Sequence, residues 1–227
     1  KTYFLNGRMD WQLASRADLS AQFGVSQGDW RSGHNTDSPT DVLEPRVQDS
    51  RAQYLQLTYH KVESEQREWR VHVYHSRNRF DANAVGDLTS LGLGVVSVDQ
   101  YLLQTRSNIE LQVNETWTPD LRGVWGGEVR RDAVVSPQNY NSGRELSGTL
   151  GRAFGNLEWH AHDRVLLQGG AMVEHHYFTG TDVSPRAAVN LTVSPGHVLR
   201  LGVSKAYRSP TFFEQEGNQV YLLTSGA

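Results

Sequence analysis

The chain of 227 residues contains no cysteine, so it can form neither disulfides nor thiolate metal sites, although this absence does not localise the protein. It also lacks any apolar run near the ~20 residues that a membrane-spanning helix needs. Its mean hydropathy of −0.55 is correspondingly low. These features exclude a protein that crosses a membrane with helices.

A surplus of one charge sign is also missing. The chain has 22 Lys and Arg against 25 Asp and Glu, which gives a net charge of −3. Because the two signs are interspersed, there is no clustered basic surface of the kind that binds nucleic acid, and nucleic acid is not an expected partner. The first residues, KTYFLNGRMDWQL, lack the features of a signal peptide, which indicates a mature chain, a fragment or a cytosolic protein.

Polar stretches divide the chain into segments of about ten or more residues that alternate with a period of two, which predicts strands. Short polar stretches fall at residues 14–18, 62–66, 116–120, 160–164 and 194–197, and long ones at 31–49, 80–98 and 135–144. They alternate, except that a long loop is due near residues 179–184 and only a brief one is present. Short turns at one end and long loops at the other are typical of an outer-membrane barrel.

The two faces of each predicted strand differ in polarity. In the segment REWRVHVYH, Trp69, Val71 and Val73 share one face, while Arg70 and His72 lie on the other. Six further segments repeat this split, with apolar faces at Leu55, Leu111, Val173, Leu19, Leu191 and Leu201 among others. A soluble β-sandwich alternates in the same way, so alternation alone leaves both folds open.

The positions of the aromatic residues and the strand lengths favour the barrel. Trp11, Trp69, Trp117, Trp125, Tyr3, Tyr59 and Tyr177 lie near strand ends, as the aromatic girdles of a bilayer barrel require. Residues 99–116 and 145–160 form segments far longer than the ~5–6 residues usual in soluble strands. Between Leu150 and Leu157 the alternation slips, which predicts either a β-bulge near residues 151–155 or a strand that rises beyond the membrane. The expected fold is all-β, an antiparallel transmembrane β-barrel segment of about ten strands with short periplasmic turns and long extracellular loops.

Two stretches near the C-terminal end carry a family resemblance. SPR at residues 184–186 opens one predicted strand, and KAYRSPTFFE at residues 205–214 follows the strand LRLGVS. Together they resemble the mid-barrel signature of TonB-dependent outer-membrane receptors, in which a strand runs into a phrase similar to aromatic-Arg-Ala-Pro-Thr/Ser-aliphatic-x-Glu. Ser209 stands where Ala is usual, and Phe212 stands where Leu is usual. Pro210 removes a ladder donor and biases Ser209 out of the helical region, so the strand is expected to end at a turn on the outer rim.

The resemblance implies a structural role for six motif residues at this strand-to-loop turn: Ser184, Pro185, Arg186, Arg208, Pro210 and Glu214. Arg208 is expected to pair with Glu214 or Glu216. The resemblance further implies active uptake of a scarce, bulky nutrient, most often an iron-siderophore complex, across the bacterial outer membrane. It implies outer-membrane lipid as the surroundings, and a TonB energy-coupling complex that acts through a plug domain.

Members of this family have about 22 strands, so residues 1–227 are expected to form part of one barrel domain without a plug. The chain ends in TSGA, which is read as a loop of a longer receptor. Two alternatives remain at this stage: a passive porin or small outer-membrane barrel, and a soluble β-sandwich adhesin or lectin-like domain.

Other candidate sites are weaker. His160 with His162, and His175 with His176, lack a carboxylate at a recognisable metal spacing, so neither a metal nor another cofactor is predicted. Glu110 and Glu174 could serve as an acid–base pair, but carboxylates are ordinary in a wet barrel lumen, and no catalytic residue or enzymatic activity is predicted. The residues that contact ligand are not identified by any motif.

Overall fold

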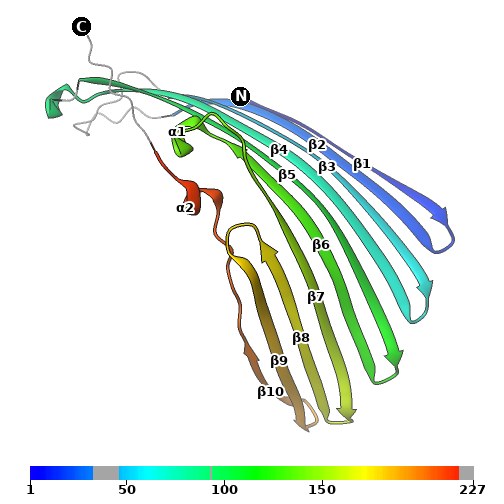
Figure 1. Cartoon of the computed structure of the whole chain (residues 1–227). Coiled ribbons are helices and arrows are strands. Elements are labelled where there is room, and N and C mark those ends of the chain that lie inside the picture. The colour runs from blue at the N-terminus through cyan, green and yellow to red at the C-terminus, as the bar shows by residue number, and fades with distance from the viewer. Residues whose placement is uncertain (33–45, 93, 220–227) are drawn as a thin grey trace.

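A computed structural model describes residues 1–32, 46–92 and 94–219. Ten antiparallel strands form one sheet in chain order, so each strand pairs only with its neighbours in sequence (Figure 1). The strands are β1 Thr2–Ala14, β2 Ala17–Ser32, β3 Arg46–Ser64, β4 Arg67–Asp87, β5 Val95–Thr118, β6 Leu121–Val135, β7 Leu146–His162, β8 Val165–His176, β9 Gly180–Ser194 and β10 His197–Ser204. The predicted fold and the expected number of strands are confirmed.

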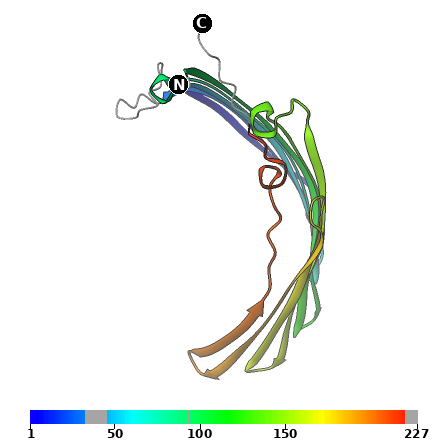
Figure 2. The ribbon, with the colours of Figure 1, turned by 60° about the vertical axis from the view of Figure 1, so that its left-hand side comes forward.

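The described residues also form three short helices: η1 Thr89–Leu91, α1 Pro137–Tyr140 and α2 Phe212–Glu216. None of the helices in the described ranges is long and apolar enough to cross a membrane. The sheet bends into a crescent, and both α2 and the residues 205–211 that lead to it lie on its concave side (Figure 2). We call the concave side the inner face and the convex side the outer face.

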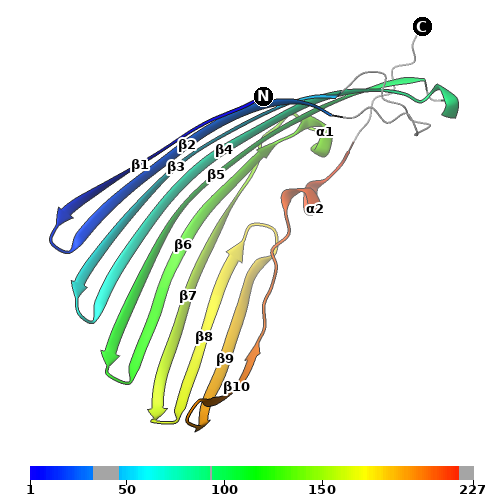
Figure 3. The same cartoon turned by 180° about the vertical axis from the view of Figure 1, so that it is seen from behind.

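All five short turns lie at one end of the sheet, and η1 and α1 lie near the other end (Figures 1 and 3). Each short turn falls inside the stretch that the sequence predicts, with two residues between the paired strands. A brief connection is present as expected, but it lies at residues 177–179, because residues 180–184 belong to β9. Loop 31–49 is described only at its two ends, and the remainder lies outside the described residues.

The predicted long loop at residues 80–98 is wrong over most of its length. β4 and β5 stay paired as far as Asp87 with Val95, so only the residues between those two strands are not in strands. Backbone pairing does not require an apolar face, and polar cross-strand pairs continue the ladder, among them the hydrogen bond from Asn83 to Asp99. Gly92 turns the chain with a φ of 73°, a conformation that glycine adopts at little cost. This hairpin therefore rises well above the apolar part of the sheet.

The predicted bulge in β7 is also wrong. β6 and β7 pair without a register shift from Val134 opposite Leu146 to Leu121 opposite Trp159. The alternation slips because Leu150 faces inward and is covered, with 1% of its surface exposed, whereas Leu157 faces outward and is 51% exposed. An apolar residue on the inner face thus makes the two-residue alternation look shifted although the strand has no bulge there.

The outer face carries a continuous apolar band. Apolar residues of neighbouring strands lie side by side in this band, as Val71 does beside Leu111, and Val73 beside Ile109. Many of these side chains are exposed, including Leu55, Val73, Ile109, Val129, Leu157, Val173, Leu191, Leu201 and Val203. Exposed apolar side chains on one face of a single sheet match the lipid-facing surface of a transmembrane barrel.

Tryptophans cover this band near the short turns. Val113 lies directly between Trp69 on β4 and Trp125 on β6, and none of its surface is exposed. The Trp69 indole N–H donates to the Glu63 carboxylate at 2.8 Å. The polar edge of the indole therefore faces the turn, while the apolar body of the ring covers the band. This is the amphipathic placement that aromatic residues adopt at a membrane interface, and it agrees with the predicted aromatic girdle.

β10 ends where its ladder with β9 loses a donor. Ser204 lies opposite Arg186, and at the next position the Lys205 amide donates to the Pro185 carbonyl at 3.0 Å. Proline has no N–H with which to return the second bond of an antiparallel pair. The strand therefore stops at Ser204, earlier than the position at Pro210 that the sequence suggested.

Candidate lumen site

The inner face carries a row of ionisable side chains that the strand register aligns. Glu128 on β6 lies opposite Arg152 on β7, and Arg152 lies opposite Glu174 on β8. Arg152 Nε is 3.3 Å from Glu128, and its Nη2 is 3.2 Å from Glu174. Directly opposite side chains of adjacent strands are close enough to interact, so one guanidinium is held between two carboxylates.

These three groups are largely shielded, because the exposed fractions of their side chains are 8% for Glu128, 27% for Arg152 and 14% for Glu174. The Nε atom of Arg152 is buried and has no hydrogen-bond partner with good geometry among the described residues. The trio carries one positive and two negative charges. A shielded excess of negative charge with an unsatisfied donor is costly alone, so this row is prepared for a further polar contact.

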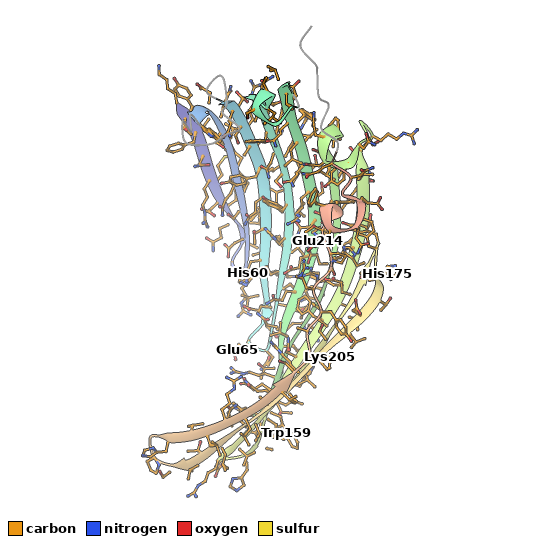
Figure 4. All side chains as sticks on the ribbon, turned by 90° about the vertical axis from the view of Figure 1, so that its left-hand side faces the viewer. His60, Glu65, Trp159, His175, Lys205 and Glu214 are labelled. Atoms are coloured by element: carbon orange, nitrogen blue, oxygen red, sulfur yellow. The ribbon has the colours of Figure 1, made fainter. Side chains whose placement is uncertain are left out.

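Ser209 supplies one such contact. Its hydroxyl donates to Glu174, and this bond joins β8 to the chain after β10. We call residues 205–218 the inner segment, because they run along the concave side from β10 through α2 (Figure 2). Figure 4 labels Lys205 at its start and Glu214 within α2. At its far end the Asn218 amide donates to the Asn139 carbonyl of α1 at 2.8 Å.

Aromatic rings hold α2 against the sheet. Phe212 stacks on Tyr177 with 5.1 Å between ring centroids, and it contacts Phe178 edge-on at 5.5 Å. Tyr177 in turn covers Gly148 on β7, where a Cβ atom would collide with its ring. Phe213 meets Tyr140 of α1 edge-on at 6.5 Å. Burial raises the pKa of the Tyr177 phenol.

The motif itself fixes the start of α2. The Arg208 guanidinium donates two hydrogen bonds to the Glu214 carboxylate, at 2.9 and 2.8 Å. Glu214 also accepts from the Thr211 amide at 2.8 Å, and Thr211 caps the helix in return, which completes a capping box. Mainly the Arg208 hydrogen bonds, and next the Thr211 amide, lower the pKa of Glu214 from 4.5 to about 2.

A second charged cluster lies nearer the long-loop end of the inner face. Asp132 on β6 accepts from Arg106 at 2.6 Å and from Arg130 at 2.9 Å. Its side chain is only 15% exposed. This cluster carries net positive charge, in contrast to the acidic row around Arg152 next to it.

A wider groove of about 860 Å³ follows the inner face toward the short turns. It is lined by four acidic side chains (Glu65, Glu68, Glu115 and Glu158) and four basic ones (Arg67, Arg122, Arg186 and Arg200). Several are already paired within the sheet, as Arg122 is with Glu158 at 2.6 Å and Arg186 with Asn156 at 2.7 Å. The groove is therefore polar, balanced in charge and pre-ordered by these pairs.

The six motif residues occupy two adjoining places. Pro185 and Arg186 on β9 lie beside the start of the inner segment, and Ser184 lies opposite Met172 on β8. Arg208, Pro210 and Glu214 lie further along, where Arg208 and Glu214 pair. The expected turn at the outer rim is corrected: residues 205–211 run along the concave side instead of turning outward, because Ser209 and Phe212 fasten them to the sheet.

The weaker candidate sites do not assemble. His175 contacts Thr181 at 2.9 Å, whereas His176 is buried 4.1 Å from the ring of Tyr177, and neighbours in a strand point to opposite faces. Glu110 lies in the same inner row as Glu174, but two further strands separate them. In the described ranges no three His, Cys, Asp or Glu side chains gather as metal ligands would.

Comparison with known proteins decides the family. The family model for the β-barrel of TonB-dependent receptor-like proteins matches residues 2–226. The chain belongs to this family. Receptors of this family lie in the bacterial outer membrane, so the expected localisation is confirmed. A search of curated proteins returns no match.

Solved structures share the fold of this TonB-dependent receptor barrel. A variant of the ferric enterobactin receptor PfeA from Pseudomonas aeruginosa superposes with a TM-score of 0.70 at 15% identity, over 92% of this chain and 33% of that one. The siderophore receptor PirA from Pseudomonas aeruginosa gives 0.68 at 12% identity, over 92% and 34%. The copper transporter OprC gives 0.66 at 16% identity, over 94% and 37%. The chain spans about a third of the length of these structures.

One alternative left open by the sequence is now excluded. A β-sandwich needs two packed sheets, whereas all ten described strands lie in one sheet. Sequence reasoning missed the row of Glu128, Arg152 and Glu174 as a unit, because only the register between strands aligns residues that lie 24 and 22 positions apart.

Proposed function

We propose that this barrel belongs to a receptor that actively imports a scarce, bulky nutrient across the outer membrane, and that the nutrient is an iron-siderophore complex. The observation that carries the proposal is membership of the TonB-dependent receptor family over nearly the whole chain. Structures of the same fold include receptors for ferric enterobactin and for a siderophore. A large curved wall with a polar inner face suits a cargo too large for passive diffusion.

The inner face supplies two kinds of contact for such a cargo. The aromatic group of Tyr177, Phe178 and Phe212 lies at the long-loop end, next to the basic cluster of Arg106 and Arg130 around Asp132. Aromatic and cationic side chains recognise flat, anionic ligands through stacking and charge-assisted hydrogen bonds. This part of the inner face, at the extracellular end of the barrel, is thus our candidate for ligand contact.

The energy for uptake would come from a TonB complex in the inner membrane, acting through a plug domain in the barrel lumen. The groove of about 860 Å³ near the short turns supports this partner, because it is polar and its acidic and basic residues balance. We assign the wall of this groove to contact with the plug, and residues 1–227 to a single barrel domain.

For the six motif residues we propose a structural role. Pro185 ends the β9–β10 ladder, which frees the chain to enter the lumen. Arg208 and Glu214 close the start of α2, and Pro210 stiffens the connection between them. None of these residues needs to touch ligand for this role.

Uptake in cells tests the proposed function. A strain without the receptor gene is offered radioactive iron on a panel of purified siderophores, and the same panel is given to the parent strain and to a strain without TonB. We expect at least one ferric siderophore to enter only the parent. Uptake that persists at full rate without TonB would show a passive pore, and uptake of every siderophore without the receptor would exclude this cargo class.

A pair of variants then separates the two regions of the inner face. Arg106→Gln removes a charge from the basic cluster, whereas Arg122→Gln removes one from the groove near the short turns. We expect the first to weaken binding of the ferric siderophore to purified receptor. The second should leave binding intact and reduce uptake only.

A further inference from the structure

A second groove lies on the outer face, away from the lumen. It has a volume of about 550 Å³ and crosses the first four strands, between Tyr3 on β1 and Arg79 on β4. One half of its lining is apolar, with Tyr3, Leu5 and Val25, and the other half is basic, with Arg51, Arg77 and Arg79. Among the described residues that line it none is acidic.

The strand register creates this composition. Leu5, Val25, Gln53 and Arg77 lie opposite one another in one row across the four strands. Tyr3, Gln27, Arg51 and Arg79 form the next row. Both rows face outward, because their residues alternate with inward residues in the same phase as the apolar band. Neighbouring rows on one face are about 7 Å apart, so three arginines from two strands share a small area.

The groove lies across the upper border of the apolar band. On β4 the band ends at Val73, and the outward residues that follow are His75, Arg77 and Arg79. On β1 and β2 apolar residues continue to Leu5 and Val25, which are 61% and 48% exposed. This border lies toward the long loops, at the outer leaflet of the membrane. The groove thus meets acyl chains on one side and lipid headgroups on the other.

The arginines are positioned but keep donors available. Arg51 Nε bonds Asp49 at 3.2 Å, and Arg79 bonds Asp81 at 2.6 Å while it lies 5.4 Å from the centre of the Tyr101 ring. Both side chains remain about half exposed, at 56% and 47%. Arg77 is exposed and makes no hydrogen bond or ion pair with the rest of the described chain.

We propose that this groove binds a phosphate-bearing lipid of the outer leaflet, with the phosphate between Arg77 and the free donors of Arg51 and Arg79 and an acyl chain along Leu5 and Val25. A guanidinium fork matches the oxygens of a phosphate, and hydrogen bonds to such a charged group are the strong ones. The apolar half of the groove is continuous with the lipid-facing band, so a membrane amphiphile meets both halves at once. A free anion would use only the arginines.

Binding of lipid A to the purified full-length receptor tests this site. Bisphosphorylated lipid A is titrated into receptor in detergent, and bound lipid is counted by native mass spectrometry; dephosphorylated lipid A and inorganic phosphate are run beside it. The variant R51Q/R77Q/R79Q is compared with the parent. R77Q is further compared with R131Q, because Arg131 is another exposed arginine on the outer face but lies outside the groove.

We expect the triple variant to bind bisphosphorylated lipid A about tenfold or more weakly, the effect of losing one or more charge-assisted hydrogen bonds. R77Q should weaken binding severalfold, and R131Q should leave it unchanged. Dephosphorylated lipid A should bind the parent and the triple variant equally. Heat-modifiable migration on gels confirms that each variant remains folded.

Three results would overturn the proposal. The first is equal binding by the parent and the triple variant. The second is an equal loss with R131Q, which would mean that the arginines act only through general surface charge. The third is displacement of lipid A by inorganic phosphate at similar concentration, which would mean that the apolar half contributes nothing and the site takes a free anion.

Discussion

An arginine placed on either face of β5 should reveal which face meets lipid. Leu111 is the middle residue of the apolar band on this strand, between Ile109 and Val113, and it lies beside Val71 and Gly127 on the neighbouring strands. Its neighbour Gln112 points inward and donates to Asn114 at 3.1 Å. Leu111→Arg and Gln112→Arg thus place the same side chain at adjacent positions of one strand but on opposite faces of the sheet.

The expected costs differ in size. A cationic side chain on the lipid face near the bilayer midplane costs about 2–4 kcal/mol in the free energy of unfolding. At Gln112 the substitution removes one neutral hydrogen bond in a wet lumen, a loss of about 0.5–1.5 kcal/mol. Ser107→Arg, at the border of the band on the same outer face, should cost about 0–1 kcal/mol.

Unfolding of the full-length receptor by guanidinium chloride in phosphatidylcholine vesicles, followed by tryptophan fluorescence, measures all three variants. A β-sandwich core would also reject arginine at Leu111, so the comparison with Ser107 is decisive. If Leu111→Arg and Ser107→Arg cost the same, or if Gln112→Arg costs as much as Leu111→Arg, the assignment of the outer face to lipid is refuted.

Three further predictions concern the orientation and the inner segment. A cysteine at Asn83 should react with an impermeant maleimide on intact cells and one at Glu65 should not, and the reverse pattern would invert the barrel. Because the pKa of Glu214 is lowered from 4.5 to about 2, its pairing with Arg208 is fully present above pH 4.5 and is lost as pH falls toward 2. A spin label on α2 should therefore gain mobility only between pH 4.5 and 2, whereas in the Glu214→Gln variant the label should be mobile at every pH. A gain in mobility near neutral pH would contradict the pairing. Arg208→Ala and Pro210→Ala should leave outer-membrane levels nearly normal and change uptake by modest factors, since the proline restricts mobile states by about 0.4–1 kcal/mol; complete loss of ligand binding with the barrel intact would place this turn in the binding site.

Much of the wall could be predicted because its information is local. Alternation such as Trp69, Val71 and Val73 against Arg70 and His72 gives both the strand and its two faces, since successive side chains of a strand point in opposite directions. Two-residue turns require polar, turn-forming residues, so the five short turns could be placed closely. The number of strands and the order of the hairpins follow from these two signals.

The errors arose where the solvent on one face changes. Above the membrane an outward residue need not be apolar, so the hairpin between Phe80 and Val98 has no sequence period, and its polar pattern predicts a loop. Leu150 faces the lumen but is covered, so its apolar character imitates a shifted strand. Both cases depend on what covers a residue, which the chain does not specify locally.

Local signals in the sequence are enough to predict an alternating, ten-stranded barrel wall and to locate the family motif near its C-terminal end, because period and turn chemistry act between residues close in the chain. Which side chains meet across strands depends instead on the three-dimensional pairing of the strands. Glu128, Arg152 and Glu174 form one charged row, and Arg51 and Arg79 face one groove, because the register places them opposite one another. The path of the inner segment was likewise decided in three dimensions: Pro185 cannot return a hydrogen bond to Lys205, so the chain leaves the sheet there, and Glu174 and Tyr177 from another hairpin hold it against the inner face.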